Sequence, residues 1–102
     1  MPKDLYVSSL LDVYGYCLNE KQRTVLEYYY NDDLSLSEIA ENEGITRQGV
    51  ADLIKRSETQ LRQLESKCGY CEKFMKLKSL SAVLSNTDNS NLKEIIDIIE
   101  SL

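Results

Sequence analysis

Apolar residues recur along this chain at spacings of three and four positions, and no segment alternates with the period of two expected of a strand. The first helical segment is predicted over about residues 5–17, and Gly15 weakens its second half. Its expected inward stripe consists of Leu5, Ser9, Leu10, Val13, Tyr14 and Cys17. The pattern therefore predicts an all-α fold.

Capping residues predict where the next three helices begin. Asn19, with Gln22 three positions later, predicts the second helix, and Ser35 with Glu38 forms a capping box for a short third helix. Thr46 is the expected cap of a long fourth helix that reaches about residue 65. The second helix is expected to bury Gln22, Val25, Leu26, Tyr29 and Tyr30, and to stop at Asn31, Asp32 and Asp33.

The segment from residue 34 to residue 55 has the physical parts of a helix-turn-helix. A small residue stands where two helices cross, a glycine suited to positive φ stands at the turn, and apolar residues follow it. These places are filled by Ala40, Gly44, Ile45, Val50 and Ile54. Many units of this kind bind protein rather than DNA, so the motif alone does not name the target.

Projecting the fourth helix at 100° per residue separates a buried face from an exposed one. The buried face is expected to contain Leu53, Ser57, Val50, Leu61, Leu64 and Ile54. On the opposite side lie Arg47, Gln48, Ala51 and Lys55, the positions that a recognition helix would present to a major groove. The helix continues toward Lys78 only if Gly69 permits it.

A polar loop is predicted at residues 85–90, followed by a last helix capped by Asn91 and Glu94. Its apolar stripe is Leu92, Ile95, Ile96, Ile99 and Leu102, flanked by Ile98. Further apolar positions in the long helix and its extension are Leu61, Leu64, Phe74, Leu77 and Leu80. This surplus predicts a homodimer, unless the last helix folds back and covers the stripe within one chain.

Length and charge limit the organisation and the partners. The 102 residues are expected to form a single helical domain, with a helix-turn-helix core at about 19–66 and an extension at 67–102. A net charge of −5, and of −1 over residues 34–56, means that any nucleic-acid contact must be local. The sequence shows neither a signal peptide nor a membrane-spanning run, so we expect a cytoplasmic protein.

Basic residues beyond the exposed face of the fourth helix complete the expected binding set. Residues 67–82 carry a local excess of +3, a candidate contact for RNA or phosphate if it is not simply a solvated helix face. The additional candidate residues are Arg56, Arg62, Lys67, Lys73, Lys76 and Lys78.

Cysteine chemistry gives a further alternative. Cys68 and Cys71 have the spacing of a thiol redox pair, but no strand is predicted before them, and Cys17 is expected in the core. The chain contains no histidine, and no catalytic set, metal site or cofactor site is predicted. We therefore do not expect an enzyme.

Five segments of the chain together match a known family: LNEKQR at 18–23, YYY at 28–30, DLSLSEIA at 33–40, GITRQGV at 44–50 and IKR at 54–56. They resemble the YlxM family of small bacterial helix-turn-helix proteins, which are usually encoded beside the signal recognition particle GTPases. The resemblance covers residues 5 to about 78, and a more distant one links the chain to region four of sigma factors. The chain departs from the family pattern at residues 68–71.

This resemblance implies an all-helical fold and a regulatory role in protein targeting, with no catalytic residue. Our first hypothesis is an adaptor that binds the particle's GTPase or its RNA. The alternative is a transcription regulator that reads DNA through Arg47, Gln48, Ala51 and Lys55. The third is a redox protein that uses Cys68 and Cys71.

Overall fold

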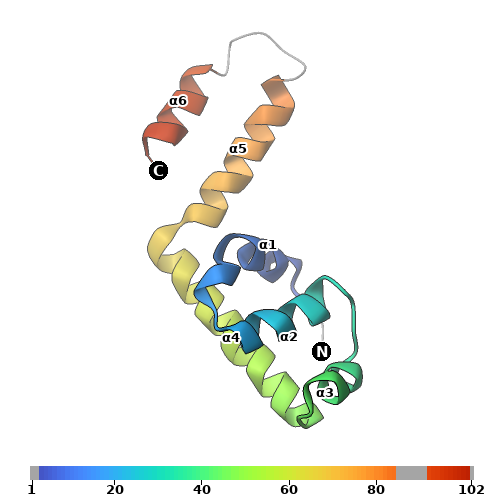
Figure 1. Ribbon diagram of the computed structural model, residues 1–102. Coiled ribbons are helices and arrows are strands. Elements are labelled where there is room, and N and C mark those ends of the chain that lie inside the picture. The colour runs from blue at the N-terminus through green and yellow to red at the C-terminus, as the bar shows by residue number, and fades with distance from the viewer. Residues whose placement is uncertain (1–2, 85–91, 102) are drawn as a thin grey trace. The chain divides into compact units, whose positions relative to one another are not determined.

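The computed structural model describes residues 3–84 and 92–101, and within these ranges every regular element is a helix (Figure 1). The all-α prediction is confirmed. The elements are α1 (Leu5–Tyr14), a 3-10 turn η1 (Gly15–Cys17), α2 (Glu20–Tyr30), α3 (Leu36–Glu43), α4 (Arg47–Cys68), α5 (Tyr70–Leu84) and α6 (Leu92–Glu100).

The chain divides into two compact units, Met1–Lys67 and Cys68–Leu102. The boundary falls where the sequence separates the helix-turn-helix core from its extension. The first unit begins well before residue 19, because α1 packs into it. That the whole chain forms a single domain stays a prediction.

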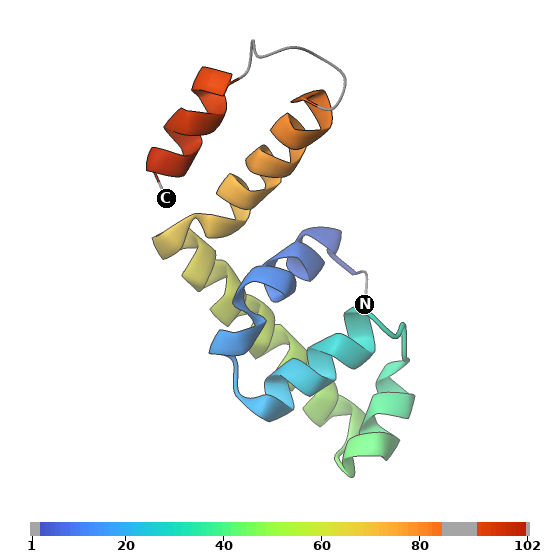
Figure 2. The same ribbon diagram turned by 45° about the horizontal axis from the view of Figure 1, so that its top comes forward.

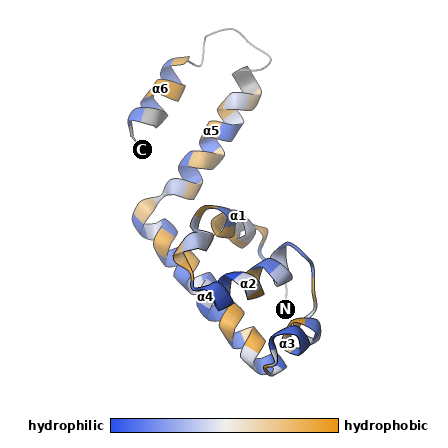
Figure 3. Cartoon of the chain, in the orientation of Figure 1, coloured by the Kyte–Doolittle hydropathy of each residue, from blue (hydrophilic) through white to orange (hydrophobic). Residues whose placement is uncertain are grey.

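In the first unit, α2 crosses α4, and side chains of both α1 and α2 bond to α4 (Figures 1 and 2). Apolar and polar segments alternate along α4, as expected of a helix with one buried face (Figure 3). The predicted buried face is confirmed at Val50, Ile54, Ser57 and Leu61, while Leu53 and Leu64 are half-buried. The other fully buried side chains of this core are Val7, Leu10, Val25, Leu26 and Ile39.

Two residues of the predicted α1 stripe were placed wrongly. Leu5 is 78% exposed, because the helix only begins there and packs through a face turned away from it. Cys17 is exposed rather than in the core, because α1 ends at Tyr14 and a 3-10 turn redirects the side chains after it. The face that does pack consists of Val7, Leu10, Leu11 and Tyr14.

The second unit is a helical hairpin. Gly69 has φ +67°, a left-handed conformation that ends α4 instead of continuing it. Helix α6 then lies antiparallel to α5 (Figures 1 and 2), and the Lys73 ammonium donates to the Ser101 carbonyl oxygen at 2.5 Å. The predicted loop at 85–90, the Asn91 cap, Leu102 and the side chains of Ile98 and Ile99 lie outside the described residues.

Candidate functional site: the exposed face of α4

The turn between α3 and α4 is built by residues within a few positions of one another. The Ser35 hydroxyl accepts from the Glu38 amide at 3.1 Å, and the Glu38 carboxylate accepts from the Ser35 amide at 3.0 Å. Hydrogen bonds with Ser35 lower the pKa of Glu38, and the bond donated by the Ser35 backbone contributes most. At the other end Gly44 adopts φ +66°, and its N–H donates to the Ala40 carbonyl. The predicted capping box and left-handed turn are both confirmed.

The start of α4 is fixed in the same local way. Ile45 donates its N–H to the Ala40 carbonyl at 3.1 Å, and the Thr46 hydroxyl accepts from the Gly49 amide at 2.9 Å. The predicted Thr46 cap is thereby confirmed. A Cβ at Gly49 would lie 3.1 Å from the Thr46 hydroxyl oxygen, so glycine leaves room for the cap.

Four of the predicted contact residues define what we call the α4 face: Arg47, Gln48, Ala51 and Lys55. All except half-buried Ala51 are exposed, and Arg56 beside them is exposed as well. The Gln48 amide nitrogen donates to the Asp52 carboxylate at 3.0 Å. Since a carboxylate only accepts, this bond orients the amide and leaves the Gln48 carbonyl available to another donor.

Side chains of α1 and α2 hold α4 in place through hydrogen bonds. The Tyr14 hydroxyl donates to Glu65 at 2.6 Å, the Gln22 amide donates to Gln60 at 3.2 Å, and the Tyr30 hydroxyl donates to Glu58. Burial, followed by the bond to Glu58, raises the pKa of Tyr30. These bonds make α4 a fixed support for its exposed face.

Arg62, a predicted contact residue, has a partner within the first unit. Its guanidinium donates to the Asp4 carboxylate at 2.7 Å, and Asp4 in turn caps α1 by accepting from the Tyr6 amide. The Arg62 bond is the main reason that the pKa of Asp4 is lowered. This arrangement gives Arg62 a structural use, joining the start of α1 to α4.

The four lysines of the predicted basic patch are divided between the two units. Lys67 is exposed near the end of α4, whereas Lys73, Lys76 and Lys78 lie on α5. Lys76 and Lys78 are exposed, and Lys73 is engaged with the carboxyl end of α6. Their predicted contact with RNA or phosphate stays a prediction.

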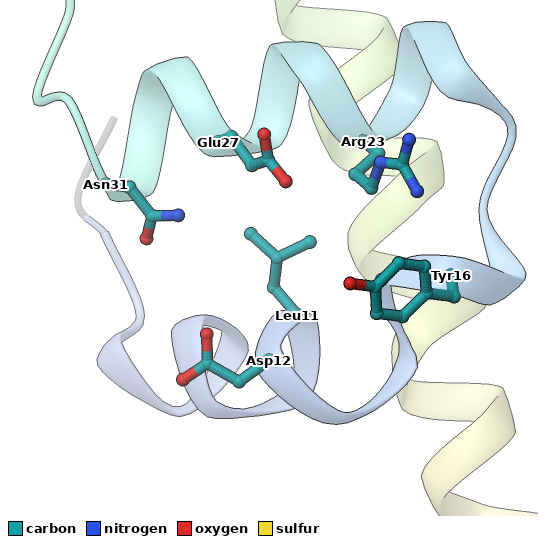
Figure 4. A pocket seen from close by; sticks show the side chains of 7 residues that line it. Leu11, Asp12, Tyr16, Arg23, Glu27 and Asn31 are labelled. Carbon is teal, nitrogen blue, oxygen red and sulfur yellow. The ribbon is translucent and has the colours of Figure 1, made fainter.

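A hollow of about 380 Å³ between α1 and α2 was not foreseen from the sequence. Leu11 points into it, Arg23 and Tyr16 lie at one end, and Asp12 and Asn31 lie at the other (Figure 4). The Arg23 guanidinium stands 5.4 Å from the centre of the Tyr16 ring. The sequence contains no signal that predicts this hollow, because the hollow depends on how α1 and α2 pack against each other.

The thiols differ in environment: Cys68 is exposed at the end of α4 and Cys71 is buried in the first turn of α5. Among the described residues, no three His, Cys, Asp or Glu side chains are grouped as they would be around a metal ion. Nor does any helix in the described ranges have the length and apolar character needed to cross a bilayer.

Comparison with known proteins matches the chain over residues 1–102 to the UPF0122 family, described as "Putative helix-turn-helix protein, YlxM / p13 like". A UPF0122 protein of Clostridium kluyveri is 43% identical over 102 residues, covering 100% of this chain and 82% of the relative. UPF0122 proteins of Shouchella clausii and Bacillus mycoides are 41% and 38% identical, each covering 100% of this chain and 98% of the relative.

Proposed function

The chain belongs to the UPF0122 family of YlxM-like helix-turn-helix proteins, and from this premise we propose a cytoplasmic regulatory protein of the signal recognition particle pathway. It binds the particle's GTPase or its RNA through the α4 face and acts by binding, without catalysis. The observation that carries the proposal is that Arg47, Gln48 and Lys55 are exposed on a helix whose start is fixed by local hydrogen bonds. The pathway itself rests on the sequence resemblance.

Charge favours a local contact over an extended grip on phosphates. Asp52 lies beside Gln48 on α4, and the helix-turn-helix segment has a net charge of −1. An A-form RNA duplex also has a major groove too narrow for a helix, so an RNA contact would involve a loop or bulge. A protein surface, or unpaired RNA presented by a protein, fits these constraints.

A DNA-binding regulator is the second candidate, and the Gln48–Asp52 bond specifically favours it. With one N–H held by Asp52, the Gln48 amide keeps a second N–H and its carbonyl, the pair of groups that recognises adenine in the major groove. Arg47 is the candidate for recognising guanine, because a guanidinium can donate to both acceptors on the major-groove edge of that base.

The deciding experiment is a pull-down from cell extract in which both the bound proteins and the bound RNA are identified. We expect the targeting GTPase or the particle RNA in the bound fraction, and Arg47→Ala with Lys55→Ala should deplete it. A variant with Lys21→Ala and Lys93→Ala removes the same charge from exposed positions off the α4 face and should bind normally. Recovery of neither component would contradict the pathway.

Salt dependence separates a contact with nucleic-acid phosphates from a contact with protein. If the α4 face grips phosphates, the Arg47→Ala, Lys55→Ala variant should reduce the slope of log affinity against log salt by about two units. A protein contact through the same face should show a weaker dependence on salt. Filter binding with duplex DNA and with particle RNA measures the slope for each nucleic acid, and the pull-down repeated at several salt concentrations measures it for the GTPase.

A further inference from the structure

Apolar side chains in the second unit remain exposed although α6 packs along α5. Phe74 and Met75 on α5 are 45% and 44% exposed, and Leu92 and Ile96 on α6 are 49% and 44% exposed. The sequence left open whether the last helix would cover its stripe by folding back on the same chain. Helix α6 does fold back, but Leu92 and Ile96 of its stripe remain exposed.

The two helices of this hairpin carry opposite charges. Helix α5 has three lysines and one glutamate, whereas α6 has one lysine and three acids. Lys78 on α5 is exposed one turn after Phe74, and Glu100 on α6 is exposed one turn after Ile96, so each charge lies on the same side of its helix as an exposed apolar side chain. Each helix therefore presents both apolar area and the charge that the other helix complements.

We propose that the hairpin of α5 and α6 is the surface through which two copies of this chain associate. A two-fold axis would set α5 of one copy against α6 of the other, so that lysines meet acids twice and the exposed apolar side chains are buried. Pairing two antiparallel hairpins makes a four-helix bundle, which supplies the core that a two-helix unit lacks. A surface complementary to itself in charge identifies a second copy as the occupant.

This interface differs from the one that the sequence pattern suggested. Leu61 is fully buried and Leu64 half-buried on α4, so these residues serve the first unit. Association is therefore assigned to the second unit alone, and it is independent of whatever binds the α4 face.

Sedimentation equilibrium on the full chain tests the proposal, and the expected result is a dimer at micromolar concentration. Replacing Phe74 and Ile96 together with lysine should weaken association by about tenfold or more, while circular dichroism shows that helicity is retained. Leu5→Lys is the matched control, because Leu5 is 78% exposed but lies in the first unit. It should leave association unchanged.

Charge reversal tests the pairing of α5 with α6. Lys78→Glu should weaken the dimer, and Glu100→Lys should do the same, because each variant sets like charges opposite each other. Combining the two changes should restore association. A monomeric full chain would overturn the proposal. A dimer that is broken by Leu5→Lys but not by the Phe74 and Ile96 changes would also overturn it, and so would a hairpin that binds only a different protein.

Discussion

Gly44 and Gly49 stand five positions apart and serve opposite purposes. Gly44 is needed for its backbone, because φ +66° is unfavourable for residues with a Cβ and most unfavourable for β-branched ones. Gly49 is helical and is needed only for space beside the Thr46 cap.

We therefore predict that Gly44→Val destabilises the protein by about 2 kcal/mol or more. Gly49→Ala should change stability by less than about 1 kcal/mol, since the gain in helix propensity is opposed by the close approach to the Thr46 hydroxyl. Thermal melts of both variants provide the measurement. Equal losses would show that the turn does not require the left-handed conformation.

Glu38 gives α3 a dependence on pH. Its pKa is lower in the folded protein than its ordinary value of 4.5, so its charge stabilises the fold above that value and this contribution is lost as the pH falls through the folded pKa. Glu38→Gln keeps an acceptor in the capping box and removes only the charge.

We expect Glu38→Gln to lower the melting temperature slightly at pH 7 and to approach the wild type as the pH falls through the folded pKa of Glu38, below which both side chains are neutral. Melting curves across this range measure the difference. Glu41→Gln removes the same charge from an exposed position of α3 outside the capping box and serves as the control. A difference that grows at low pH would contradict the assignment.

At the scale of the element, α4 depends on tyrosine hydroxyls from two other helices. Tyr30→Phe removes the donor to a partly buried carboxylate, so we predict a loss of about 1–2 kcal/mol. Tyr16→Phe is the control: Tyr16 is 88% exposed, and the expected change is within about 0.5 kcal/mol. Urea denaturation of both variants measures the free energies of unfolding.

Helix starts were predictable because their signals are local. Asn19 and Ser35 each bond to a residue three positions away, so the sequence contains the whole interaction. The same holds for the buried face of α4, which follows from periodicity alone. The candidate residues Arg47, Gln48 and Lys55 were found exposed for that reason.

Other features depend on partners far away in the sequence. Arg62 bonds to Asp4 across 58 positions, and the spacing of apolar residues along the chain does not predict that pairing. The exposure of Cys17 follows from a 3-10 turn that a helical pattern does not distinguish from one more turn of α1. Gly69 could be recognised as a weak point, but whether it bends or ends a helix is decided by the packing around it.

At the scale of the whole molecule, the first unit contains its own core. Val7, Leu10, Leu26, Ile39 and Ile54 are all fully buried and all lie before residue 68. We therefore predict that a fragment spanning residues 1–67 is helical and unfolds cooperatively.

Circular dichroism during thermal unfolding of that fragment and of the full chain is the measurement. A broad, non-cooperative transition in the fragment would show that the second unit is required for the first to fold, and would support a single cooperative domain.

The two capping boxes also bear on how quickly the chain finds its structure. Each closes a loop of only three residues, so the starts of α2 and α3 can be selected before distant segments meet. Chains whose contacts are mainly local fold on the microsecond to millisecond scale. If the helix starts are selected early, the later collapse of the chain only has to pack helices that have already begun at the correct residues. The apolar stripes are then exposed for a shorter time, and the chain has less opportunity to aggregate.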